Sequence, residues 1–156
     1  PARVVNVSSA AHKFVKKINF DDINSENSYQ TFSVYGQSKL ANILFTKKLA
    51  ALLKESKITV NCLHPGWVST SLGQQNDRTF LASLMAFFSP LLAKNSLKGA
   101  ETSIYLCSSD KVSKISGKYF ADCKIKSISE GAKDKKDEEA LWDLSLQLTK
   151  LKGISF

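Results

Sequence analysis

The 156-residue sequence predicts a single α/β domain, residues 1–156, built on a parallel sheet. Three short apolar runs, at 3–7, 58–63 and 117–122, indicate strands, and a helical segment follows each of them. This alternation favours parallel strands joined by right-handed crossovers. Parallel sheets are covered on both faces, and three strands are few for a free-standing sheet of that kind. Because a strand of central character begins directly after Pro1, we expect the carboxyl-terminal part of a doubly wound sheet whose amino-terminal strands are missing from this chain.

The first strand and the helix after it give the clearest local signals. Arg3–Val7 is apolar and β-branched and stops at a Ser-Ser-Ala-Ala sequence, which is typical of a buried strand that enters a loop. Residues 12–33 are polar, so we expect a long loop that is functional or partly structured. The apolar spacing that follows predicts a helix over 33–54, with Ser33 as its N-cap.

The sequence after the first helix predicts several shorter elements. A second buried strand is expected to end at a Pro-Gly turn, and the segment after that turn is polar at first and then apolar. The last helix begins acidic and ends basic, an order that complements the helix dipole. The predicted elements are the strand 58–63, the turn Pro65-Gly66, the segment 72–93, the helix 96–107, the strand 117–122 and the helix 137–150.

Charge and cysteine content argue against several classes of protein. Lys and Arg number 22 against 14 Asp and Glu, a net charge of +8, but the lysines are scattered and no basic segment is interleaved with aromatics, which disfavours nucleic-acid binding. A basic surface still attracts phosphates or acidic lipid headgroups. Cys62, Cys107 and Cys123 are odd in number and lack C-x-x-C spacing, so we expect free thiols in a reducing compartment and no metal site. No apolar run approaches the ~18 residues of a membrane span.

Tyr35 and Lys39 are the most informative pair of residues. Four positions apart on the predicted helix, they lie one turn apart on the same face, so the ammonium group can sit beside the phenol. A nearby cation favours the phenolate form, which a tyrosine needs to act as an acid or base near neutral pH. Spacing alone leaves a plain solvated helix face as the alternative, because many helices carry such pairs.

Three segments in this order resemble the short-chain dehydrogenase/reductase family, and within it the retinol dehydrogenase group. They are Arg3–His12, Tyr35–Thr46 and Val60–Val68, and the later Ser116–Phe120 and Leu141-Trp142 fit the same group. The resemblance covers nearly the whole chain. It implies a Rossmann-type fold and an NAD(P)-dependent oxidoreductase that interconverts a lipophilic, retinol-like alcohol and its aldehyde or ketone.

The resemblance also implies roles for particular residues. Tyr35 would be the catalytic acid and base, Lys39 would support it and hydrogen-bond the nicotinamide ribose, and Ser9 would hold the substrate oxygen. A loop-capping hydroxyl is the alternative for Ser9, and a simple turn is the alternative for the Pro-Gly dipeptide. The residues expected to contact the cofactor are Tyr35, Lys39, Pro65, Gly66, Val68 and Thr70.

The sequence departs from the family pattern in the region that seats the cofactor. The glycine-rich turn for the pyrophosphate, the residue that selects NAD or NADP, and the upstream catalytic Asn are all absent from the 156 residues. NADP is therefore favoured over NAD by resemblance only, and the chain alone should bind nucleotide poorly. A catalytically inactive fragment that acts as a non-enzymatic interaction module is the alternative function.

The segment 72–93 corresponds to the variable substrate-binding region of such enzymes. Its apolar part fits a lid over a lipophilic substrate, a peripheral contact with a membrane, or ordinary core packing. By resemblance the protein would lie on the cytoplasmic side, associated with the endoplasmic reticulum through the missing amino-terminal part. The exact substrate and any homo-oligomer are left open. Trp67 and Trp142 are expected to pack, and His64 is given no role.

Overall fold

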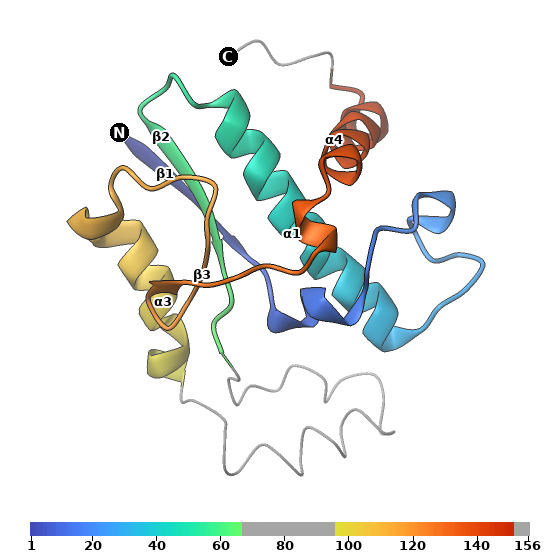
Figure 1. Ribbon diagram of the computed structural model, residues 1–156, viewed down its shortest axis with the longest axis horizontal. Helices are drawn as coiled ribbons and strands as arrows, with labels where there is room; N and C mark the ends of the chain where they lie inside the picture. The colour runs from blue at the N-terminus through green and yellow to red at the C-terminus, as the bar shows by residue number, and fades with distance from the viewer. Residues whose placement is uncertain (67–95, 152–156) are drawn as a thin grey trace.

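The computed structural model describes residues 1–66 and 96–151 of the chain, which form a sheet covered by helices (Figure 1). The four strands are β1 (Ala2–Val7), β2 (Ile58–Leu63), β3 (Tyr119–Ala121) and β4 (Lys124–Ile125), and they pair in that order. The first three are parallel, and β4 runs antiparallel to β3. Among the described residues the outer edge of β1 has no partner strand. The predicted parallel α/β architecture is confirmed.

Helices cover both faces of the sheet. α1 (Thr31–Leu52) and α4 (Lys135–Thr149) lie on one side of it, and α3 (Ser96–Ser108) lies on the other (Figure 1). On the α3 side, the Arg3 guanidinium of β1 donates to the carbonyl oxygens of Leu106, 3.0 Å, and Ser109, 2.8 Å. These bonds tie the carboxyl end of α3 to the first strand.

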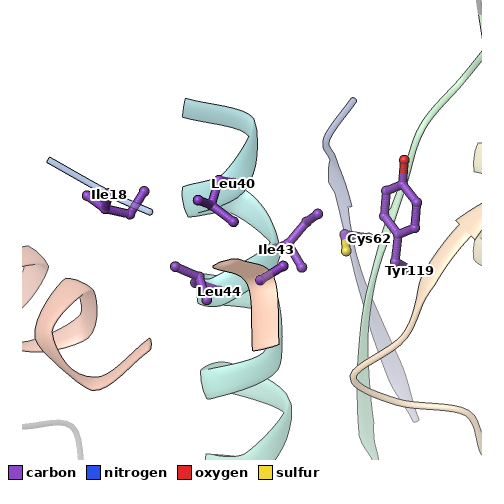
Figure 2. Close-up of a cluster of buried hydrophobic side chains, with 7 residues drawn as sticks. Ile18, Leu40, Ile43, Leu44, Cys62 and Tyr119 are labelled. Carbon is purple, nitrogen blue, oxygen red and sulfur yellow. The ribbon is translucent and has the colours of Figure 1, made fainter. Parts of the chain in front are cut away.

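Neighbouring side chains of β2 enter different cores. Cys62 packs with the α1 side chains, whereas Leu63 packs on the α3 side. This alternation follows from the strand geometry and explains why β2 is apolar along most of its length. The first cluster contains Ile18, Leu40, Ile43, Leu44, Cys62, Tyr119 and Ala132 (Figure 2). The second contains Leu63, Leu106, Val112 and Phe120.

Two predicted helix starts and one strand differ from the structure. Ser33 lies inside α1, whose N-cap is Gln30 without a side-chain capping bond, so the prediction of Ser33 as a cap was wrong. α4 begins earlier than predicted because the Asp134 carboxylate caps it, accepting from two backbone amides of its first turn. The hairpin to β4 was not predicted, since Asp122 and Cys123 adopt positive φ, 51° and 56°, without a glycine to signal the turn.

The polar loop before α1 is partly structured, as predicted. Short 3-10 helices form at Ala10–Phe14 and Phe20–Asp22. The Asp22 carboxylate then accepts hydrogen bonds from the backbone amides of residues 26, 27 and 28. The loop therefore has a defined path between the end of β1 and the start of α1.

All three cysteines are free thiols. Burial raises the pKa of the Cys62 thiol to about 12, so this sulfur stays protonated inside the core. Within residues 1–66 and 96–151, no group of three or more His, Cys, Asp or Glu side chains is arranged to hold a metal ion. Nor does any helix of that part have the length and apolar character needed to cross a bilayer.

Candidate active site

The carboxyl ends of β1 and β2 form the edge at which the predicted site residues meet. Val7 lies opposite Leu63 in the parallel register, and the backbone N–H of Ser8 donates to the Leu63 carbonyl at 2.7 Å. Ser9 therefore leaves the sheet beside the start of the turn Pro65-Gly66. This edge is where parallel α/β sheets bind ligands.

Gly66 has a φ of 87°, in the left-handed region that favours glycine. The missing side chain also leaves the backbone open to a close approach. The other predicted residues of this turn, Val68 and Thr70, lie outside the described residues, as do Trp67 and the segment 72–93.

Tyr35 and Lys39 lie on one face of α1, as their spacing predicts. The Lys39 Nζ atom is 5.4 Å from the centroid of the Tyr35 ring, within the range of a cation–π interaction. Tyr35 is 42% exposed, and its hydroxyl group contacts no partner among the described residues. The Tyr35 side chain is therefore partly accessible from solvent.

The serine before Ser9 fixes this turn of α1 against the end of β1. Ser8 is buried, and its hydroxyl group donates to the Lys39 carbonyl at 2.7 Å. The Ser8 hydroxyl group is therefore occupied by a bond inside the protein. Ser9, by contrast, is only half-buried. The bond places the backbone of Lys39 directly beside the serine pair.

Asn42 and Thr46 extend the same attachment along the helix. The Asn42 side chain donates to the Val7 carbonyl at 3.0 Å. The Thr46 hydroxyl accepts from the Asn6 side-chain amide at 2.9 Å and donates to the Asn42 carbonyl at 2.7 Å. Because these groups are partly buried, the network stabilises one position of α1 relative to β1.

Gly36 lets the loop approach α1 closely. A Cβ atom at this position would lie 3.0 Å from the Ala11 carbonyl oxygen and 3.4 Å from the Phe14 Cβ atom. The glycine stands next to Tyr35, and Ala11 belongs to the 3-10 helix that Ser9 caps. The loop carrying Ser9 is thus pressed onto the helical turn that carries the tyrosine.

Hydrogen bonds from neighbouring residues hold both the carbonyl group and the hydroxyl oxygen of Ser9. Its Oγ atom accepts from the Ala11 amide at 3.2 Å, and its carbonyl accepts from the His12 amide at 3.2 Å. The capping role, which the sequence left as the alternative, is therefore present. Among the described residues the hydroxyl hydrogen has no acceptor.

Several of these positions were not predicted as site residues from the sequence. Gly36 carried a usable signal, because a glycine inside a helix often marks close packing. Ser8 and Asn42 carried none, since their roles depend on which backbone carbonyl lies opposite them. Ser8 and Asn42 position the helix and the strand, and Tyr35, Lys39 and Ser9 remain the candidate site residues.

One hollow of the described region lies away from these residues. It has a volume of about 740 Å³ and lies at the opposite edge of the sheet, where Pro1, Ile58 and Gly117 line it. None of the predicted site residues contributes to it. The hollow and the candidate site thus lie at opposite ends of strands β1 and β2.

Known proteins are similar in sequence to most of this chain. The sequence profile of the family described as short chain dehydrogenase matches residues 2–80. Retinol dehydrogenase 14 from Homo sapiens is 47% identical over 146 residues, which make up 93% of this chain and 43% of that protein. Retinol dehydrogenase 12 from Homo sapiens is 42% identical over 148 residues, 95% of this chain and 46% of that protein. The chain therefore spans less than half the length of these curated relatives.

Solved structures give the same result for the fold. An uncharacterised protein from Mycobacterium paratuberculosis matches 96% of this chain with a TM-score of 0.70 and 31% identity, over 50% of its own length. A short chain dehydrogenase from the same organism, bound to NAD, matches 83% of this chain with a TM-score of 0.52 and 23% identity, over 44% of its length. The second likeness concerns the fold alone.

Proposed function

Since the chain belongs to the short-chain dehydrogenase family, we propose that its Tyr35–Lys39 face carries the proton transfer of an alcohol–carbonyl oxidoreductase. The observation that supports this most is the attachment of that face to the strand end bearing Ser9. An acid/base group, a cation beside it and a free hydroxyl donor then share one edge of the sheet. A solvated lysine–tyrosine pair elsewhere on a helix would have none of these neighbours.

In the proposed reaction the Tyr35 phenol gives a proton to the substrate oxygen during reduction and takes it back during oxidation. The Lys39 ammonium stabilises the negative charge that develops on the phenol. Ser9 donates its free hydroxyl hydrogen to the substrate oxygen and so orients the carbonyl group. Hydride transfer is the chemistry that a nicotinamide dinucleotide supplies when bound.

The residues present fit the nicotinamide end of such a cofactor. Gly66, with its positive φ and no side chain, leaves space at the strand end, and Lys39 offers an ammonium group to a ribose hydroxyl. We propose Pro65, Val68 and Thr70 as further contacts. The glycine-rich turn for a pyrophosphate is absent from the sequence, so the fit is limited to this end. NADP is proposed ahead of NAD on family resemblance alone.

The proposed substrate is a lipophilic alcohol or its aldehyde or ketone, in keeping with the names of the retinol dehydrogenases to which the chain is similar. The net charge of +8 supports a peripheral contact with an acidic membrane surface. We place this contact on the cytoplasmic side of the endoplasmic reticulum as part of the proposal. The apolar segment 72–93 would cover the substrate.

A non-enzymatic interaction module is the second candidate. Exposed apolar side chains on α3 and α4, among them Leu97, Ile104 and Leu148, would supply the contacts of such a module. Calorimetric titration with NADPH and NADH separates the two functions, because an enzyme of this family has to bind one of them. Absence of binding by both nucleotides would support the module.

The direct test is Tyr35→Phe, assayed by NADPH absorbance with all-trans-retinal as the probe. Removal of the phenolic proton should lower kcat by about 100-fold or more, the usual contribution of general acid–base catalysis, while the affinity for NADPH stays within about twofold. Tyr29→Phe is the matched control, since Tyr29 is exposed in the preceding loop. Unchanged turnover in Tyr35→Phe would refute the assignment.

A further inference from the structure

His12 is a fully buried side chain, 0% exposed, whose two ring nitrogens both have partners. Nδ1 lies 2.6 Å from the Ser9 carbonyl oxygen, and because a carbonyl can only accept, this nitrogen carries the proton. Nε2 lies 3.2 Å from the backbone nitrogen of Ser129, which can only donate, so Nε2 is unprotonated. The contacts therefore select one neutral tautomer.

The two partners of this ring are far apart in the chain. Ser9 follows the first strand, whereas Ser129 lies 117 positions beyond His12, in the segment that leads into α4. The Ser129 hydroxyl also donates to the His12 carbonyl at 3.5 Å, and the Tyr119 ring of β3 meets the imidazole edge-on at 5.0 Å. The ring thus sits where the loop after β1, strand β3 and the carboxyl-terminal segment come together.

Further contacts hold that segment on the same loop. A Cβ atom on Gly131 would lie 2.1 Å from the Lys16 carbonyl oxygen, so only glycine permits this approach. The Asp137 carboxylate of α4 accepts from the Ile18 amide at 3.3 Å. Residues 127–137 therefore dock along residues 12–18, and His12 provides the polar contact closest to Ser9.

On the premise that Ser9 holds the substrate oxygen, as proposed above, we propose that His12 is a positioning residue that fixes Ser9 and couples it to the segment around Ser129. Two donors of His12, its backbone amide and Nδ1, converge on the Ser9 carbonyl. That carbonyl cannot rotate without breaking both bonds. The Ser9 hydroxyl oxygen, which accepts from the Ala11 amide, is then kept in one position.

The neutral state of His12 agrees with its surroundings. Burial lowers the pKa of His12 below 6.5, the hydrogen bond to the Ser9 carbonyl opposes this shift, and the nearby Lys13 charge adds to it. The ring therefore keeps Nε2 free as an acceptor at neutral pH. Loss of the Nδ1 contact should loosen Ser9, and loss of the Nε2 contact should loosen the backbone at Ser129.

Two substitutions separate the two contacts. In His12→Asn the side-chain amide nitrogen can occupy the place of Nδ1, which keeps the donation to Ser9 and loses the acceptor for Ser129. In His12→Gln the side-chain oxygen can reach the place of Nε2, which keeps the acceptor and loses the donor. Both variants are neutral and polar, so each serves as the control for the other.

The readout is amide hydrogen exchange in the full 156-residue chain, which does not depend on activity. The Ala11 amide reports on the Ser9 hydroxyl oxygen, and the Ser129 amide reports on the ring. We expect His12→Gln to speed exchange at Ala11 about tenfold and to leave Ser129 protected, and His12→Asn to do the reverse. Unchanged protection at Ala11 in His12→Gln, or equal effects of the two variants at both amides, would overturn the proposal.

Ring nitrogen shifts and turnover complete the test. The chain has two histidines, so His64→Gln leaves His12 as the one remaining imidazole, whose signals should show a proton on Nδ1 alone. A proton on Nε2 would contradict the coupling. If retinal is reduced, kcat should fall more in His12→Gln than in His12→Asn, with KM for NADPH unchanged. Absence of turnover with the expected exchange pattern would count against the proposed function and not against the coupling.

Discussion

The ion pair between α1 and α4 is expected to be the most costly polar contact to remove from this fold. The Glu138 carboxylate is 1% exposed and lies 2.8 Å from the Lys47 Nζ atom and 2.7 Å from the Lys135 Nζ atom. Lys47 is 18% exposed and also donates to the Ala132 carbonyl at 2.7 Å, whereas Lys135 is 71% exposed. The two lysines therefore contact the same carboxylate from very different surroundings.

Because Lys47 is more buried than Lys135, its removal should lower the free energy of unfolding by more. Lys47→Met leaves a buried carboxylate with one solvent-exposed partner and leaves the carbonyl of the buried Ala132 without its donor, so the loss should be about 3–5 kcal/mol. Lys135→Met removes an exposed partner and should cost about 0–1 kcal/mol. Met matches Lys closely in size and helix propensity, which leaves the charge as the main change.

Urea unfolding followed by far-UV circular dichroism measures both variants. For an m-value of about 2 kcal/mol/M, Lys47→Met should lower the midpoint by about 2 M and Lys135→Met by less than about 0.5 M. Equal shifts in the two variants, or a Lys47→Met midpoint indistinguishable from the wild type, would refute the reasoning. Either result would mean that the burial of a lysine does not determine how much its contact with Glu138 contributes to stability.

The same carboxylate gives the pH dependence a definite sign. Burial acts to raise the pKa of Glu138, but hydrogen bonds from Lys135 and Lys47 and their charges outweigh it, so the pKa lies below 4.5. Its contribution to stability is fully present above the unfolded value of 4.5 and is lost as the pH falls through the folded pKa. In Lys47→Met this acid-side loss of stability should be smaller.

Two further changes test the packing around the candidate site. Thr46→Val should cost about 1–3 kcal/mol, because it leaves the Asn6 amide without its acceptor and removes the second donor of the Asn42 carbonyl; Thr46→Ser, measured by the same urea titration, should stay close to the wild type. Gly131→Ala should destabilise the chain by about 3 kcal/mol, the upper end for overpacking, since its Cβ atom would meet the Lys16 carbonyl oxygen. Thermal unfolding of Gly131→Ala within 1 °C of the wild type would contradict that close approach.

The order of strands and helices could be predicted because it rests on local patterns. Buried parallel strands read as apolar runs, and α1 has apolar positions at helical spacing. The small strand β4 could not be predicted, since its turn uses Asp122 and Cys123 in a conformation that neither residue signals. Ser33 misled the prediction because a serine near a helix start resembles a cap, whereas α1 begins at Thr31, after a Gln30 that makes no side-chain capping bond.

Within the candidate site, the sequence identifies residues whose chemistry is evident from their type and spacing. Tyr35 and Lys39 stand one turn apart, and Ser9 stands at a strand end. The positioning contacts of Ser8 and Asn42 depend on the pairing of α1 with β1, which no local pattern specifies. His12 could not be predicted for the same reason, because its second partner lies 117 positions away.

Among the described residues no strand pairs with the outer edge of β1, which has a practical consequence for work with this chain. Exposed strand edges template pairing with other chains, and natural proteins protect them with prolines, bulges or charged side chains that point outwards. The charged residue of β1, Arg3, is turned onto the carbonyls of α3 and cannot protect the edge. Val4, Val5 and Val7 make the strand strongly β-forming. We therefore expect a charged substitution on this strand to raise the solubility of the chain at high concentration.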